Sequence, residues 1–172
     1  MTRKKAAAFK FKPFSDKQIK VLTWWNELSP VKDKDILIAD GSIRAGKTVV
    51  MSLSFIMWAN ENFEGENFAL CGKTIGSLRR NVVKPLKKML KSRGYKCKDF
   101  RSSSENYLTI SRNGKANDFY LFSGRDESSQ DLIQGITLAG VLFDEVALMP
   151  QSFVNQATAR CSVEGAKMWL TK

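Results

Sequence analysis

The chain has 172 residues, of which 43% are apolar and 26% are charged, as is typical of one soluble globular domain with a hydrophobic core. It contains no histidine, and its three cysteines form no CxxC pair, which excludes histidine-based catalysis and argues against disulfide frameworks or zinc sites. The net charge of +11 indicates an anionic partner, with nucleic acid first and a membrane surface second. Without a spanning apolar run or a signal-peptide core, we expect a cytoplasmic protein with no membrane partner.

The amino end is predicted to be a flexible basic arm over residues 1–12, followed by one domain over residues 13–172. Ser15 and Asp16 are suited to cap a helix. We expect this helix to continue to the Ser29-Pro30 pair, because four apolar side chains fall on one face: Ile19, Leu22, Trp25 and Leu28.

A strand, a glycine-rich loop and a helix follow in the order that a nucleotide-binding unit requires. Residues 36–39 are typical of a short buried strand, and residues 49–60 of a helix that is apolar nearly all round. Between them, residues 41–48 (GSIRAGKT) match the Walker A pattern G-x-x-x-x-G-K-[ST]. Such a loop curls its backbone N–H groups around phosphate oxygens at the start of a helix, so we predict an ATP site here.

Individual roles follow from this pattern. Lys47 is predicted to reach the β- and γ-phosphates, and the Thr48 hydroxyl to contact Mg²⁺. Arg44 could contact the γ-phosphate or remain in solvent, and Gln18 could bind the adenine edge through its amide or face solvent. The predicted nucleotide-binding residues are Gln18, Gly41, Ser42, Ile43, Arg44, Ala45, Gly46, Lys47 and Thr48.

A strongly basic helix is predicted over residues 77–93, after a strand at 67–71. Pro85 should kink or divide this helix, and Gly94 should end it. Residues 73–101 hold eleven Lys and Arg against one acid. A row of cations neutralises DNA phosphates without reading sequence, so this helix is the predicted DNA contact; the alternative is a solvated helix face.

The remaining elements are a hairpin at residues 107–122 with Asn113-Gly114 at its turn, a buried strand at 138–143, a helix at 153–160 and a strand at 167–171. Alternating strands and helices predict a three-layer α/β fold with a mainly parallel sheet.

Two carboxylates, Asp144 and Glu145, follow the buried strand at 138–143, in the manner of a Walker B motif. Ligands of open α/β sheets bind at the carboxyl ends of strands, so Asp144 is predicted to hold Mg²⁺ and Glu145 to polarise the attacking water. The second acid favours hydrolysis over transfer to a substrate. Arg125 and Arg160 are candidate arginine fingers or ordinary surface residues.

Taken in order, GSIRAGKT, SLRRNVVKPLKKML, FSGRDE, IQGITLAGVLFDEVALMP and FVNQATARCSVEGAKMWLTK resemble the large terminase subunit of tailed bacteriophages and prophages over nearly the whole chain. The resemblance implies a RecA-like ATPase that threads double-stranded DNA into a procapsid as a homo-oligomeric ring on the portal, together with a small terminase subunit. It gives Lys47, Thr48, Asp144, Glu145 and Gln18 the roles above.

The sequence departs from that family in two places. The chain stops about where the coupling motif and the carboxyl-terminal nuclease of the family would follow, so we expect no nuclease activity from it. Gln134 stands where some relatives carry an arginine, which leaves the arginine finger unassigned. Two other functions remain open: another RecA-like DNA translocase or helicase, and a basic nucleic-acid-binding module with an inactive nucleotide pocket.

Overall fold

The computed structural model describes residues 12–41, 46–102, 104–125 and 127–172. Helices and strands alternate along most of the chain. In order they are α1 (Asp16–Thr23), β1 (Ile36–Ala39), α2 (Lys47–Asn62), β2 (Asn67–Gly72), α3 (Ile75–Leu78), the π-helix η1 (Arg79–Val83), α4 (Lys84–Ser92), β3 (Lys96–Arg101), β4 (Asn106–Arg112), β5 (Lys115–Ser123), α5 (Glu127–Gln134), β6 (Gly140–Phe143), the 3₁₀ helix η2 (Val146–Leu148), α6 (Gln151–Ala159) and β7 (Lys167–Thr171).

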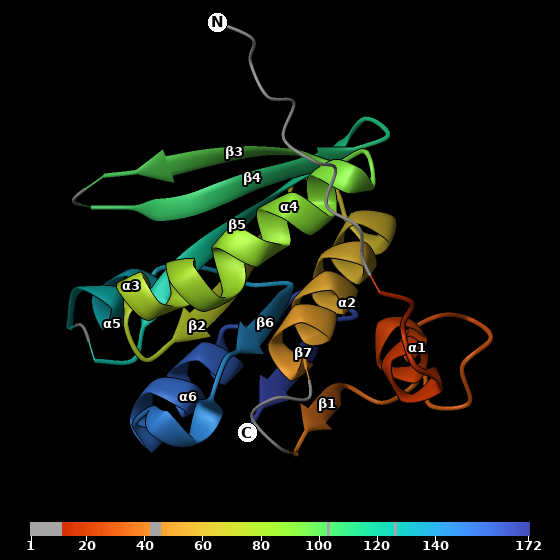
Figure 1. The fold of residues 1–172 in the computed structure, drawn as a ribbon. Coiled ribbons are helices and arrows are strands. Elements are labelled where there is room, and N and C mark those ends of the chain that lie inside the picture. The colour runs from red at the N-terminus through yellow and green to blue at the C-terminus, as the bar shows by residue number, and fades with distance from the viewer. Residues whose placement is uncertain (1–11, 42–45, 103, 126) are drawn as a thin grey trace, which may run out of the picture.

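One seven-stranded sheet organises the domain, with the strand order β1-β7-β6-β2-β5-β4-β3 (Figure 1). The strands from β1 to β5 in this order are parallel, and β4 and β3 add an antiparallel extension. The core on one face is built from α1, α2 and α4, and that on the other from α5 and α6. The predicted three-layer, mainly parallel α/β fold is confirmed.

Aromatic packing against α2 anchors β7, the second strand of the sheet. Phe55 and Trp169 are fully buried, and their rings meet edge to face with centroids 5.1 Å apart. Trp24 and Trp58 contact the Trp169 ring as well. Edge-to-face pairs of this kind add to the stabilisation from burial, so β7, which lies next to the edge strand β1 and its loop, is held firmly against α2.

The first helix is shorter than predicted. It begins as expected at Ser15, whose hydroxyl accepts from the backbone N–H of Gln18 in a capping box, but it ends at Thr23. Trp24 turns into the core, so the chain leaves the helix axis, and Leu28, predicted on the buried face, is 94% exposed. The helical period of the sequence thus continues beyond the helix itself.

The first strand is also less buried than predicted. It is an edge strand that pairs only with β7 in the described part of the sheet. Ile36 and Ile38 are 48% and 53% exposed because no described element covers their side of β1.

The predicted basic helix is divided, as Pro85 indicated, but the irregularity lies before the proline. A π-turn, η1, separates α3 from α4, and the Lys84 N–H donates to the Arg79 carbonyl. Pro85 then stands in the first turn of α4, where its missing N–H is tolerated. Gly94 ends the helix with a positive φ of 81°, as predicted.

The three cysteines are all free. Burial raises the pKa of the Cys161 thiol to about 12 and that of Cys71 well above its usual range. Thiols in this condition are unreactive core side chains.

Gly140 is required by close packing at the start of β6. A Cβ added there would lie 2.7 Å from the Trp58 ring and 3.0 Å from the Lys167 carbonyl oxygen. We expect Gly140→Ala to lower the free energy of unfolding by about 1–3 kcal/mol, because neither ring nor backbone can move away cheaply. Urea denaturation measures this, with Gly135→Ala as the control, since the nearest atom to a Cβ there is 3.9 Å away. An unchanged midpoint for Gly140→Ala would contradict the packing.

Candidate nucleotide-binding site

Three parallel strands bring the predicted site residues to one edge of the sheet. Gly41 follows β1, Asp144 follows β6, and Thr171 ends β7 between them. Because the carboxyl ends of parallel strands meet at the same edge, residues distant in sequence become neighbours here.

The junction of the loop with α2 requires glycine. Gly46 caps α2 with φ 65° and ψ 21°, a left-handed conformation that side-chain-bearing residues rarely adopt. This turn places Thr48 in the first turn of α2, where its hydroxyl donates to Asp144 Oδ1 at 2.9 Å. The two halves of the predicted site, 96 residues apart in sequence, are thus in direct contact.

The Lys47 ammonium lies at the same edge. It donates to the Gly41 carbonyl oxygen at 2.6 Å and also to a main-chain oxygen of Lys172, the last residue of the given sequence. The positive charge therefore stands between the start of the loop and the end of β7, among backbone oxygens.

A threonine that the sequence did not single out joins the two acids. Thr171 is almost completely buried, and its hydroxyl donates to Asp144 Oδ1 at 3.2 Å while accepting from the backbone N–H of Glu145 at 2.8 Å. Asp144 Oδ1 thus accepts from two threonine hydroxyls, and the peptide that leads into Glu145 is tied to β7.

Glu145 has an unusual backbone conformation. Its φ of 56° and ψ of 59° are left-handed, which is uncommon for a residue with a side chain. The chain thereby turns sharply out of β6 into η2, and Glu145 is exposed, whereas Asp144 beside it is buried. Such strain often marks functional positions, where the surrounding structure maintains it.

Gln18 reaches the loop from α1. Its Oε1 accepts from the Ser15 N–H at 2.9 Å, which fixes the amide, and its Nε2 would lie 3.5 Å from a Cβ added to Gly46. A depression of about 240 Å³ opens here, lined by Lys17, Gln18, Val21, Ile38, Ala39, Asp40, Gly46, Lys47, Val50 and Met51. It joins an amide donor, apolar walls and the loop lysine, which suits a nucleoside beside its phosphates.

Other predicted residues are not brought into this arrangement. Ser42, Ile43, Arg44 and Ala45 lie outside the described residues. Arg125 lies in the turn between β5 and α5, and Arg160 caps the end of α6; both are exposed. Neither side chain has a described contact with Lys47, Thr48 or Asp144, so their assignment as arginine fingers stays a prediction.

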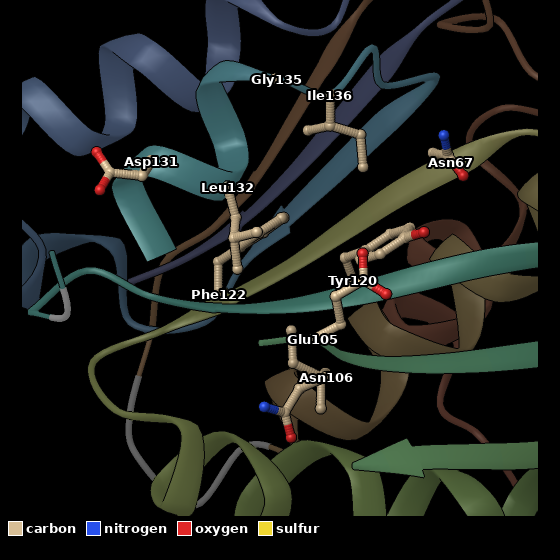
Figure 2. A pocket seen from close by; sticks show the side chains of 10 residues that line it. Asn67, Glu105, Asn106, Tyr120, Phe122, Asp131, Leu132, Gly135 and Ile136 are labelled. Atoms are coloured by element: carbon tan, nitrogen blue, oxygen red, sulfur yellow. The ribbon is translucent and has the colours of Figure 1, made fainter. Parts of the chain in front are cut away.

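A second depression, of about 360 Å³, lies between the sheet and α5 (Figure 2). Tyr120, Phe122, Leu132 and Ile136 line it, together with the acids Glu105 and Asp131. No Lys or Arg is among its described lining residues. A triphosphate would meet negative charge here without compensation, so this depression does not compete with the loop site.

The residues at the loop also suit a magnesium ion. Mg²⁺ prefers oxygen ligands and is usually bound through one or two carboxylates together with substrate phosphates. Thr48 Oγ1 and Asp144 Oδ1 offer such oxygens side by side at the end of the loop.

The sheet order, the Gly46–Lys47–Thr48 turn and the acidic end of β6 define the class of the protein: a RecA-like α/β domain with a phosphate-binding loop. The chain belongs to the terminase large subunits, because the family model for the N-terminal part of the T4likevirus-type large subunit matches residues 38–166. Comparison with curated protein sequences gives no match.

Solved structures agree with this assignment. The large terminase of a thermophilic bacteriophage is 69% identical over 93% of this chain, with a TM-score of 0.90. The same terminase in complex with ATP-γ-S is 66% identical over 92% of this chain, with a TM-score of 0.85. The chain spans 39% and 38% of the length of these relatives. The ATPase domain of the Thermus phage P74-26 large terminase shares the fold, with 16% identity over 94% of this chain, 65% of that chain covered and a TM-score of 0.63.

Within the described residues, no helix combines the length and the apolarity that crossing a bilayer requires.

Proposed function

We propose that this domain hydrolyses ATP with Mg²⁺ and that the hydrolysis drives double-stranded viral DNA into a procapsid. The observation that carries the proposal is the hydrogen bond between Thr48 and Asp144, because it joins the phosphate-loop helix to the acidic strand end. The similar terminase of the thermophilic bacteriophage has been solved with ATP-γ-S and with ADP, which supports a nucleotide as the ligand.

Each residue has a role in this proposal. The loop Gly41–Thr48, including Ser42, Ile43, Arg44 and Ala45, holds the triphosphate, and Lys47 exchanges the Gly41 carbonyl oxygen for phosphate oxygens. Thr48 and Asp144 hold Mg²⁺, which supplies neutralisation of phosphate charge when bound. Gln18 donates from Nε2 to the adenine edge, since its Oε1 already accepts from Ser15.

Glu145 is the proposed general base. Its exposed position beside the buried Asp144 allows it to orient a water and accept its proton as the water attacks the γ-phosphate. Thr171 is a positioning residue, since it holds the peptide between the two acids. A ring of copies on the portal, with a small terminase subunit, completes the proposed motor, and an arginine finger comes from Arg125, Arg160 or another residue.

Steady-state ATP hydrolysis by the 172-residue chain, with and without duplex DNA and with and without a Mg²⁺ chelator, tests the proposal. We expect magnesium-dependent turnover that DNA stimulates and that Lys47→Ala abolishes. The absence of both basal and stimulated turnover would favour a binding module with an inactive pocket. Separation of a forked duplex would favour a helicase.

A further inference from the structure

A basic groove of about 440 Å³ lies where η1 and α4 meet the end of β3. Six of its seven lining residues are cations: Arg79, Arg80, Lys84, Lys87, Lys88 and Arg101. The seventh is Val83. The groove lies beside β3, at the edge of the sheet opposite to β1 and its phosphate loop. Positive charge here is therefore separate from the nucleotide site.

One carboxylate arranges three of these cations. Asp99 accepts from Arg79 at 3.0 and 3.1 Å, from Lys87 at 2.5 Å and from Arg101 at 3.0 Å, and its side chain is 14% exposed. Burial raises the pKa of Asp99, but the hydrogen bonds from Lys87, Arg101 and Arg79 outweigh it and bring the pKa to about 2. The carboxylate is thus ionised at neutral pH and fixes side chains from η1, α4 and β3 relative to one another.

The groove keeps a large excess of positive charge. Its described lining residues include six cations and no acid, and Asp99, which contacts three of these cations, carries a single negative charge. The opposite side of α4 packs into the core, where Leu86, Met89 and Leu90 are buried. On a solvated helix face the charges point apart into water. Here cations from a helix and a strand converge on one groove, and their mutual repulsion favours the binding of an anion between them.

The extent of the charge indicates a polymer. Exposed cations continue along one side of η1 and α4 at Arg80, Lys84, Lys88 and Lys91. This row spans about 16 Å at the rise of a helix. That length corresponds to about five base-pair steps along the axis of duplex DNA and exceeds a single nucleotide.

We infer that the groove and this row bind the phosphate backbone of duplex DNA without reading its bases. The choice of DNA rests on the proposed function, whereas the place of binding rests on the groove itself. The structure thereby narrows the sequence prediction for residues 77–93 to one side of η1 and α4 and adds Arg101 from β3.

The test compares two double variants of the whole chain that lose the same charge. Arg80→Gln/Lys84→Gln changes two exposed groove residues. Lys34→Gln/Lys115→Gln changes one exposed residue before β1 and the exposed first residue of β5. Fluorescence anisotropy with a random duplex of about 30 base pairs, without nucleotide, follows binding from about 50 to 200 mM salt. Thermal melting confirms that both variants are folded.

We expect the groove variant to bind about tenfold more weakly and its slope of log K against log salt to fall by about 1.8, since two phosphate contacts are lost. The control should stay within about twofold of the parent. The charge-preserving Arg80→Lys/Lys84→Arg pair should restore binding, which excludes a purely structural effect.

Equal losses in the groove and control variants would overturn the inference, since binding would then follow net charge alone. Displacement of DNA by inorganic pyrophosphate at constant ionic strength would also overturn it, in favour of a small-anion site. Because no nucleotide is present, a chain that fails to hydrolyse ATP still gives a valid answer.

Discussion

Glu145→Gln is expected to lower kcat for ATP hydrolysis by about 10²- to 10⁴-fold, which is the usual contribution of a positioned general base. The substitution keeps the shape of the side chain and the exposed position at the end of β6, and it removes only the ability to accept a proton. Since Asp144 and Thr48 are unchanged, the Kd for MgATP should stay within about threefold of the parent.

Single-turnover hydrolysis and equilibrium binding of a fluorescent ATP analogue separate these two effects. Glu164→Gln, an exposed acid in the turn before β7, is the matched control and should hydrolyse ATP at the parental rate. Equal rates for Glu145→Gln and Glu164→Gln would remove Glu145 from the chemistry. Joint loss of binding and hydrolysis would instead point to a role in holding the ligand.

Thr171→Val should also lower kcat for ATP hydrolysis, through the positions of Asp144 and Glu145. Valine has the shape of threonine without the hydroxyl, so Asp144 Oδ1 loses a donor and the Glu145 N–H loses its acceptor in a buried place. An unsatisfied buried N–H costs about 1–3 kcal/mol of stability. A small displacement of the two acids should lower kcat by about 10- to 100-fold.

The serine variant distinguishes positioning from packing. Thr171→Ser keeps the hydroxyl and loses a methyl group, so kcat should recover while the melting temperature stays below that of the parent. KM should change much less than kcat in both variants. If serine and valine were equally impaired in kcat, or valine were unimpaired, the hydroxyl would have no part in aligning Asp144 and Glu145.

The sequence indicates the candidate site residues where their signal is contiguous. The loop at residues 41–48 and the two acids after β6 are each recognised from residues that are adjacent in the sequence. The structure brings Thr48 to Asp144 as expected. Thr171 escapes prediction because its importance comes from register: Phe143 pairs with Leu170, so Asp144 stands beside Thr171. That pairing joins residues far apart in the chain and has no local signature.

Two elements, β3 and α5, are not predicted because their composition is not typical of a strand or a helix. β3 has the sequence KCKDFR, whose charges resemble a loop, and it forms because β4 pairs with it and Asp99 gathers cations from η1 and α4. α5 has few apolar residues, so its sequence resembles a turn. The prediction for α1 is too long because Leu28 keeps the helical period after Trp24 has turned the chain into the core. Tertiary contacts decide each of these cases.

The position of Lys47 affects how ATP would bind. Its ammonium already donates to the Gly41 carbonyl oxygen at 2.6 Å, so a triphosphate would take over a charge that the start of the loop already binds. The affinity gained from this lysine is then the difference between phosphate and carbonyl partners, and the side chain needs little rearrangement to reach its new ones. Arrival of the nucleotide would at the same time free the carbonyl oxygen of Gly41, the residue with which the loop begins after β1.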